Sequence, residues 1–241
     1  MRLLKFALKR ETAMPMLALA FASAASVALV LGRIISTHNL RYSFLVWNLI
    51  LAWLPLIFAL LAAEKFTTAS ARSWHFLSLA GAWLLFFPNA PYIFTDLIHV
   101  RAFYYSGHFW VDLMLILLCA LTGLVLGFVS LYLMQSVVER MFGRPASWLF
   151  IAAVAALTGF GIYLGRFLRF NSWDVFFRPV QLYRGIGSWA ADPMANPVSL
   201  AFPVLFGAFL FVSYLMLYAL THLRPAQPAT LPPPVQQPAL A

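Results

Sequence analysis

Six apolar stretches run through this 241-residue chain, and five of them are long enough to cross a lipid bilayer as helices. A helix needs about 20 residues to span a hydrocarbon core of roughly 30 Å. The stretches run approximately over Pro15–Leu31, Phe44–Ala63, Trp110–Val138, Ser147–Phe167 and Val198–Leu220, with a shorter one at Trp74–Phe87. Hydrophobic residues make up 63% of the chain and charged residues 10%, against about 25% charged residues in a soluble domain. The composition therefore excludes a soluble globule and predicts a polytopic membrane protein.

The short stretch is interrupted by two prolines. From Trp74 to Phe87 it forms a helix only about 21 Å long, so the chain has to continue through Pro88 and Pro91 to cross the bilayer. We therefore predict an all-α fold, a polytopic transmembrane helical bundle of about six spanning helices with a proline-broken third helix. Six crossings place both termini on the same side of the membrane.

Charge and composition divide the chain into three parts. Residues 1–14 form a basic N-terminal segment, residues 15–222 the transmembrane helical domain, and residues 223–241 a proline-rich tail whose composition favours a disordered chain. The basic residues of the N-terminal segment are Arg2, Lys5, Lys9 and Arg10. Because positive residues gather on the cytoplasmic side, we expect a multi-pass protein of the cell inner (cytoplasmic) membrane with both termini in the cytoplasm.

Small residues inside the apolar stretches indicate close helix packing. The glycines that allow helices to approach closely are Gly123, Gly127, Gly159, Gly161 and Gly165. The single cysteine, Cys119, also lies inside an apolar stretch. One cysteine excludes a disulfide framework and a CxxC metal or redox motif.

The segment Phe86–His99 reads Phe-Phe-Pro-Asn-Ala-Pro-Tyr-Ile-Phe-Thr-Asp-Leu-Ile-His and places polar residues directly beside an apolar stretch. Lipid contains no water to satisfy free backbone groups, so a broken, ionisable segment at membrane depth has to be buried in protein or line a polar cavity. Each proline removes a backbone donor, and Asn89 stands where it can satisfy the backbone groups left without partners. The segment therefore predicts the main polar region of the protein.

Asp96 and His99 lie three residues apart, on one face of a helix that resumes at Pro91. A carboxylate beside an imidazole fixes the tautomer of the histidine, which suits proton transfer or metal ligation. The alternative is the solvated start of an interfacial helix, with the aspartate near its positive end. No compact metal motif is present, so we expect no metal site.

Arg166 and Arg169 lie three residues apart at the expected end of the fifth spanning helix and are followed by Asn171 and Asp174. Two guanidinium groups on one helix face form a fork that suits a phosphate or a carboxylate. Charges buried near a membrane are normally paired, so Asp174 is equally able to neutralise one of the arginines. Two interpretations stay open, an anion site and an internal ion-pair network.

Three runs of residues carry a resemblance to a known family. They are Trp83–His99, Trp110–Asp112 and Gly161–Asp174, with Asn-Ala-Pro-Tyr-Ile-x-Thr-Asp-Leu and Gly-Arg-Phe-Leu-Arg-x-Asn-Ser-Trp-Asp as the most specific phrases. From roughly Phe44 to Leu220 the chain resembles the bacterial membrane family called domain of unknown function 1361. The resemblance implies a polytopic bacterial inner-membrane protein and brings no assigned activity with it.

Three classes of function fit these residues. We favour an outer-face polar site that recognises an anionic lipid or a lipid-linked phosphate; the alternatives are a small transporter lined by the broken third helix and a non-catalytic membrane assembly protein. The predicted catalytic residues are Asp96, His99 and Asp174, and the predicted anion- or ligand-binding residues are Asn89, Tyr92, Arg166, Arg169 and Asn171. We expect membrane lipids as partners, and no cofactor, metal ion or nucleic acid. The sequence leaves open whether the protein is an enzyme and what its oligomeric state is.

Overall fold

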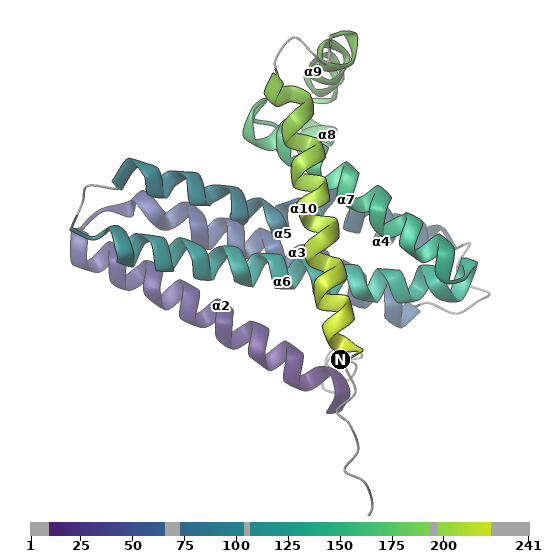
Figure 1. The fold of residues 1–241 in the computed structure, drawn as a ribbon, viewed down its shortest axis with the longest axis horizontal. Coiled ribbons are helices and arrows are strands. Elements are labelled where there is room, and N and C mark those ends of the chain that lie inside the picture. Colours follow the sequence, from purple (N-terminus) through teal and green to yellow (C-terminus); the bar gives the residue numbers. More distant parts are fainter. Residues whose placement is uncertain (1–9, 66–72, 104–106, 193–196, 223–241) are drawn as a thin grey trace, which may run out of the picture.

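The computed structural model describes residues 10–65, 73–103, 107–192 and 197–222. The predicted disordered tail and most of the basic N-terminal segment lie outside these residues. Within them the chain is helical and has no strand. Its elements are α2 (Arg10–Thr37), the 3₁₀-helix η1 (Leu40–Tyr42), α3 (Ser43–Lys65), α4 (Trp74–Phe86), α5 (Asn89–Tyr92), the 3₁₀-helix η2 (Ile93–Phe103), α6 (Phe109–Phe142), α7 (Arg144–Arg166), α8 (Asp174–Phe177), α9 (Pro179–Ala191) and α10 (Pro197–Thr221) (Figure 1).

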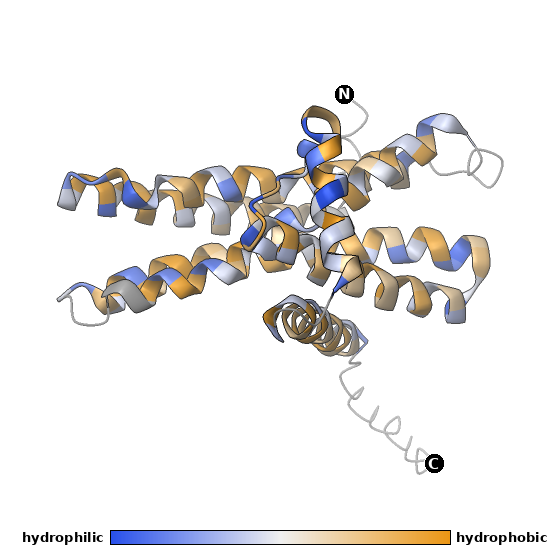
Figure 2. Ribbon diagram, turned by 90° about the horizontal axis from the view of Figure 1, so that it is seen from above, coloured by the Kyte–Doolittle hydropathy of each residue, from blue (hydrophilic) through white to orange (hydrophobic). Residues whose placement is uncertain are grey.

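Six helical segments of the described chain are long and apolar enough to cross a membrane. They are Ala13–Thr37, Leu40–Glu64, Trp74–Val100, Phe109–Phe142, Arg144–Arg166 and Pro197–Thr221. Each corresponds to one of the apolar stretches in the sequence, so the predicted helical bundle and its number of spans are confirmed. Hydrophobic residues predominate along the spanning helices (Figure 2), as helices in contact with lipid require.

The long helix α6 is the centre of the bundle. It has 34 residues and packs against α2, α3, α5, η2 and α7. α3 and α6 run alongside each other along the long axis of the molecule, whereas α10 crosses this axis steeply (Figure 1). α10 packs mainly on α7, at a crossing where Gly159 meets the backbone of Pro203 with no room for a side chain.

The third span is one continuous path made of three short helices. α4 ends at Phe86, α5 is a single turn, and η2 continues the path with 3₁₀ geometry. At the break, Asn89 Nδ2 donates a hydrogen bond to the Phe86 carbonyl oxygen at 3.0 Å. The proline-broken third helix is therefore confirmed, and so is the predicted role of Asn89 in satisfying the backbone there.

The broken third span lies tightly against α6 at Gly123. A Cβ atom at this position would be 2.7 Å from the Ala90 carbonyl oxygen and 2.9 Å from Ile93 Cδ1, so the contact requires glycine. Together with Gly159, this confirms that glycines of the apolar stretches allow close helix approach. The contact also fixes where η2 starts relative to α6.

The contact at Gly123 gives the depth of the polar region. Gly123 lies about 21 Å along α6 from Phe109, at about 1.5 Å per residue. η2 leads from this contact toward Phe109 and rises about 2 Å per residue, so Asp96 lies roughly 15 Å from the Phe109 end of the bundle. α6 is about 51 Å long and a hydrocarbon core about 30 Å thick. Asp96 therefore lies within the core when α6 is centred in the membrane.

Candidate functional site

The polar region is organised around the carboxylate of Asp96. This side chain is buried, with 1% exposure, and its Oδ1 accepts a hydrogen bond from Arg166 Nη1 at 2.8 Å. Its Oδ2 accepts one from Asn48 Nδ2 at 3.0 Å. The three residues come from η2, α7 and α3, so one carboxylate ties three separate helices together. A buried charge requires such partners, because it is costly to desolvate when unpaired.

Arg166 reaches this carboxylate from the last residue of α7, where a cation is favourable at the negative end of the helix. Its Nη2 donates to the Thr95 carbonyl oxygen at 3.2 Å and lies 3.4 Å from His99 Nδ1. The guanidinium also lies over the Tyr92 ring, 5.8 Å from its centroid. A guanidinium has five N–H donors, and these contacts together with Asp96 use at most three of them. The side chain keeps 19% exposure, so donors remain for a ligand.

His99 stands beside this pair at the edge of the polar region. In η2 the three-residue period brings His99 back onto the face of Asp96, with 3.7 Å between His99 Nδ1 and Asp96 Oδ1. His99 Nδ1 also lies 3.0 Å from the Asp96 carbonyl oxygen. A carbonyl only accepts hydrogen bonds, so the shorter of the two Nδ1 contacts favours a proton on Nδ1 and leaves Nε2 as an acceptor. The 3.4 Å approach of Arg166 Nη2 is then a close contact and not a hydrogen bond. With 43% exposure, His99 is the most accessible of the three ionisable groups.

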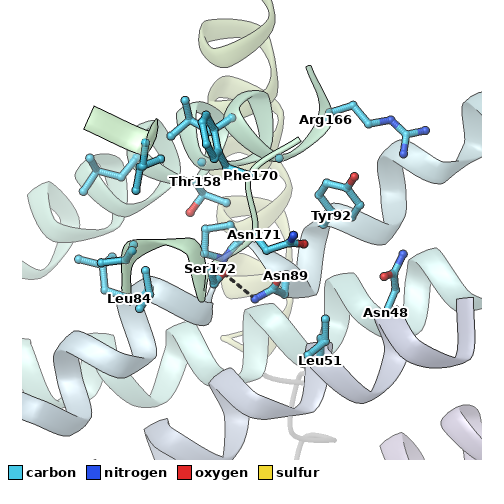
Figure 3. Close-up of a pocket in the computed structure, with 18 of the residues that line it drawn as sticks. Asn48, Leu51, Leu84, Asn89, Tyr92, Thr158, Arg166, Phe170, Asn171 and Ser172 are labelled. Atoms are coloured by element: carbon cyan, nitrogen blue, oxygen red, sulfur yellow. Dashed lines mark hydrogen bonds between the residues drawn. The ribbon is translucent and has the colours of Figure 1, made fainter. Parts of the chain in front are cut away.

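Arg166, Asp96 and His99 line a cavity of about 600 Å³. The other polar side chains in its wall are Asn48, Asn89, Tyr92, Thr158, Asn171 and Ser172. The apolar part of the wall comes from α3, α4 and α7 and includes Trp47, Leu51, Leu84, Leu85, Leu157 and Leu164. Figure 3 shows Arg166, Tyr92 and Asn48 at one end of the cavity and Leu84 at the other. The cavity is therefore amphipathic, with a polar end and an apolar end.

The segment that follows α7 closes one side of this cavity. Asn89 Nδ2 donates to Ser172 Oγ at 3.0 Å (Figure 3), which attaches the segment to the break in the third span. The backbone N–H of Phe170 donates to the Leu164 carbonyl at 3.1 Å. Asp174 is buried and accepts the backbone N–H of Asn171 at 2.7 Å. These bonds hold the segment in a fixed turn beside the polar end.

The structure brings most of the predicted site residues together. Six of the eight line the cavity: Asn89, Tyr92, Asp96, His99, Arg166 and Asn171. Asp174 is not in the cavity wall, and besides Asn171 its carboxylate faces Arg178 at 3.9 Å. No structural observation tests the catalytic role of Asp96, His99 or Asp174, which stays a prediction.

The expectation that Arg166 and Arg169 share a helix face is wrong. α7 ends at Arg166, and Arg169 has left-handed backbone geometry with φ 59°. Its side chain is exposed and outside the cavity wall. The chain leaves the helix after Arg166 because it turns into the segment held by Asn89 and Asp174. Arg166 is paired with Asp96, so the ion-pair interpretation holds for this arginine, with a different aspartate from the one considered in the sequence.

Sequence reasoning missed one residue of the site and one ion pair outside it. Asn48 is a lone polar side chain in the apolar stretch Phe44–Ala63, and a polar residue inside a membrane span is itself a functional signal. The second is a separate ion pair between Arg33 and Asp112, in which Arg33 Nε donates to Asp112 Oδ1 at 2.5 Å and Nη2 to Oδ2 at 3.1 Å. This pair joins α2 to α6 and does not line the cavity.

The chemistry that the site offers is that of a guanidinium, an imidazole and several uncharged amides and hydroxyls. Within the described ranges no group of three or more His, Cys, Asp or Glu side chains is placed to hold a metal ion. Arg166 suits an anionic oxygen, and His99 Nε2 suits a hydrogen-bond donor or a proton. The arrangement is therefore that of a binding cavity with one potential proton acceptor.

Comparison with known proteins gives a family and no activity. No curated protein and no solved structure matches the chain. A family model described as "Protein of unknown function (DUF1361)" matches residues 47–216. These include every residue of the cavity wall except Phe44, whose ring centroid lies 5.3 Å from that of His99. The match covers well over half of the chain, so this protein is a member of the family described as Protein of unknown function (DUF1361).

Proposed function

We propose that this protein binds an anionic membrane lipid or a lipid-linked phosphate, with the headgroup at the polar end of the cavity and the start of the tail along its apolar wall. The observation that carries the proposal is that Arg166 and Leu84 lie at opposite ends of a single cavity (Figure 3), whose wall also contains Leu85 and Leu157. A ligand that fills both ends has to be amphipathic.

The cavity opens toward the surface that faces lipid. Trp47 and Leu157 line the cavity and are still 55% and 53% exposed. In a spanning bundle, exposed apolar side chains at this depth face the acyl chains of the bilayer. A lipid can therefore enter sideways, without leaving the membrane.

An anionic headgroup fits the electrostatics of the polar end. Arg166 is already paired with Asp96, so the pair is neutral as a unit. The attraction between the two charges offsets the cost of removing them from water. Arg166 lines the cavity and keeps guanidinium donors that its protein contacts do not use. Charge-assisted hydrogen bonds to phosphate oxygens are among the strongest in proteins. Asn89, Tyr92 and Asn171 surround the same space.

We further propose that the polar end lies in the outer half of the cell inner membrane. With the termini in the cytoplasm, Phe109 at the start of the fourth span is on the outer side, and Asp96 lies toward that end. A headgroup at this depth, roughly 15 Å from Phe109, lies closer to the membrane centre than the headgroups of the surrounding lipids. The tail then points toward the membrane centre.

The test is to purify the protein in native-lipid particles and identify the retained lipids by mass spectrometry. The informative variant is Arg166→Gln/Asp96→Asn, which removes both charges so that neither is left buried alone. Arg169→Gln is the matched control because Arg169 is exposed outside the cavity. We expect an anionic lipid to be enriched with wild type and with the control and lost from the double variant. Unselective lipid in all three proteins would contradict the proposal.

Transport is the second candidate, because the broken third span itself lines the cavity and broken helices form the binding sites of known carriers. A carrier has to open its site to both sides of the membrane. In a Cys119→Ala background, a cysteine at Leu85 in the apolar end can be probed with an impermeant maleimide from each side. Labelling from both sides would favour transport, and protection from both sides would favour lipid binding alone.

A further inference from the structure

We infer that the headgroup carries hydroxyl groups beside its phosphate, as in a polyol or sugar phosphate, and is not a bare phosphate. This inference rests on the proposed lipid-binding function and specifies the ligand of the same cavity. It follows from the hydrogen-bonding groups that two of the three asparagines in the cavity wall, Asn48 and Asn89, leave available for a ligand.

The orientation of the Asn48 amide is fixed by its partner. Its Nδ2 lies 3.0 Å from Asp96 Oδ2, and a carboxylate that is paired with an arginine only accepts hydrogen bonds. The nitrogen therefore faces Asp96 and the oxygen is the group left over. Asn48 Oδ1 accepts no hydrogen bond from any group that the structure describes, and Asn48 lines the cavity.

Asn89 presents the same situation from the other side of the cavity. Its Nδ2 donates to the Phe86 carbonyl at 3.0 Å, which again assigns the nitrogen, and to Ser172 Oγ at 3.0 Å. Its Oδ1 has no donor among the described residues. Two carboxamide oxygens from α3 and α5 are therefore available to accept hydrogen bonds from a ligand in the cavity.

A bare phosphate meets this requirement poorly. Its oxygens are mainly acceptors at neutral pH, so they donate no hydrogen bond to Asn48 Oδ1 or Asn89 Oδ1, and their lone pairs repel those of the amide oxygens. A hydroxyl group both donates and accepts, so a polyol or sugar satisfies the two amide oxygens while its phosphate takes the free donors of Arg166. Tyr92 Oη and the side-chain amide of Asn171 form no hydrogen bond within the described ranges either, and both suit hydroxyl groups.

An ammonium headgroup supplies donors but lacks a counter-charge. Asp96 is the only carboxylate among the described residues of the cavity wall. Its two oxygens are occupied by Arg166 and Asn48, and Arg166 would repel a second cation. The charge balance of the wall therefore favours hydroxyl groups over an amine as the donors.

The size of the cavity limits what enters it. A volume of about 600 Å³ corresponds to roughly twenty groups the size of a water molecule, at about 30 Å³ each. This holds a headgroup and the first part of one tail, while the remaining chains stay in the bilayer. Recognition is therefore concentrated on the headgroup.

The test is a competition between lipids with identical acyl chains. The full-length protein is placed in phosphatidylcholine nanodiscs that contain equal small amounts of phosphatidylglycerol, phosphatidic acid and phosphatidylethanolamine, and retained lipids are counted by native mass spectrometry. We expect phosphatidylglycerol to be retained at least about tenfold over phosphatidic acid, although phosphatidic acid carries the larger charge, because a site built for a hydroxyl group rejects an analogue without it. A second competition, between a polyprenyl phosphate and its sugar-bearing form, distinguishes a sugar from a simple polyol.

The outcomes separate this inference from the proposed function. Phosphatidic acid bound as well as or better than phosphatidylglycerol, with both lost in Arg166→Gln/Asp96→Asn, would overturn the hydroxyl inference and leave the anionic-lipid site standing. Preference for phosphatidylethanolamine would overturn it in favour of an ammonium group. Retention of none above phosphatidylcholine would overturn both. The wild-type ranking tests the hydroxyl inference, and the double variant tests whether the anionic lipids bind at Arg166.

A variant of the amide adds a second readout. Asn48→Thr removes the carboxamide oxygen, and we expect it to bring the two anionic lipids to within about threefold of each other. Asn39→Ala is the control, because Asn39 caps η1 on the exposed surface and is not in the cavity wall. Unchanged selectivity in Asn48→Thr would overturn the assignment of Asn48 as the hydroxyl-binding group.

Discussion

Two arginine–aspartate pairs in this protein consist of the same residue types but lie in different surroundings. Arg33 and Asp112 meet in a two-bonded, side-on pair whose carboxylate is buried. Arg166 touches Asp96 through one nitrogen, and the second carboxylate oxygen is taken by Asn48. Only the second pair lines the cavity. We call Arg166–Asp96 the open pair and Arg33–Asp112 the closed pair. Both arginines keep unused donors, but Arg33 Nη1 is buried in protein whereas Arg166 lines a cavity. The comparison teaches that a membrane-depth ion pair indicates a site when its arginine lines a cavity, and a structural link when it lines none.

The largest effect is expected from breaking the closed pair. Asp112→Leu leaves the Arg33 guanidinium without its carboxylate, and removing one partner of a buried pair costs about 3–5 kcal/mol. The free energy of unfolding, measured by denaturant titration in detergent micelles, should fall by that amount. Arg169→Ala, on an exposed side chain, serves as the control. A variant as stable as wild type would show that the Arg33–Asp112 pair does not hold α2 to α6.

The open pair should be displaced by a change at the contact that positions η2. In Gly123→Ala the added methyl group meets the Ala90 carbonyl and Ile93, and overpacking of this kind costs about 1–3 kcal/mol. Lipid retention should fall with stability, because Asp96 shifts with η2. Gly32→Ala is the matched control, since nothing lies within 4 Å of a Cβ there. Equal stability of the two variants would contradict the tight contact between the third span and α6.

A smaller effect is expected from the segment beside the open pair. Ser172→Ala removes the acceptor of one Asn89 hydrogen bond, worth about 0.5–1.5 kcal/mol. Proteolysis or hydrogen exchange of residues 167–173 should become faster, while the spanning helices exchange as before. If exchange in this segment does not change, the bond to Asn89 is not what fixes the cavity wall.

The smallest effect on stability is expected when the closed pair is replaced as a unit. In Arg33→Leu/Asp112→Leu no charge is left unpaired, and replacing a buried pair by apolar residues is often neutral, so the free energy of unfolding should recover to the wild-type value. Lipid retention should be unchanged, in contrast to Arg166→Gln/Asp96→Asn. Loss of the lipid from both double variants would remove the distinction between the two pairs.

The fold was largely predictable because a membrane span requires a long apolar stretch, which can be recognised in the sequence. The break in the third span was predictable because Pro88 and Pro91 follow directly on its apolar part. The face shared by Asp96 and His99 also followed from spacing. The partner of Arg166 did not, because pairing across helices depends on how α3, η2 and α7 pack, which spacing along one chain does not give. The chain leaves the helix after Arg166, which separates Arg169 from the site. This turn is held by the tertiary bond between Asn89 and Ser172, together with the local bond between Asn171 and Asp174.

The most direct test of the central claim is photolabelling in membranes with an anionic lipid that carries a diazirine in its tail, followed by peptide mapping. The account predicts adducts concentrated on Gly81–Leu85 and Leu157–Leu164, the cavity wall, and reduced there in Arg166→Gln/Asp96→Asn. The segment Leu17–Phe21 of α2, in which Leu17 and Phe21 are exposed, should be labelled only at the level of bulk lipid in both proteins. Labelling of the cavity wall no stronger than that of Leu17–Phe21, or unchanged in the double variant, would contradict a lipid site at Arg166.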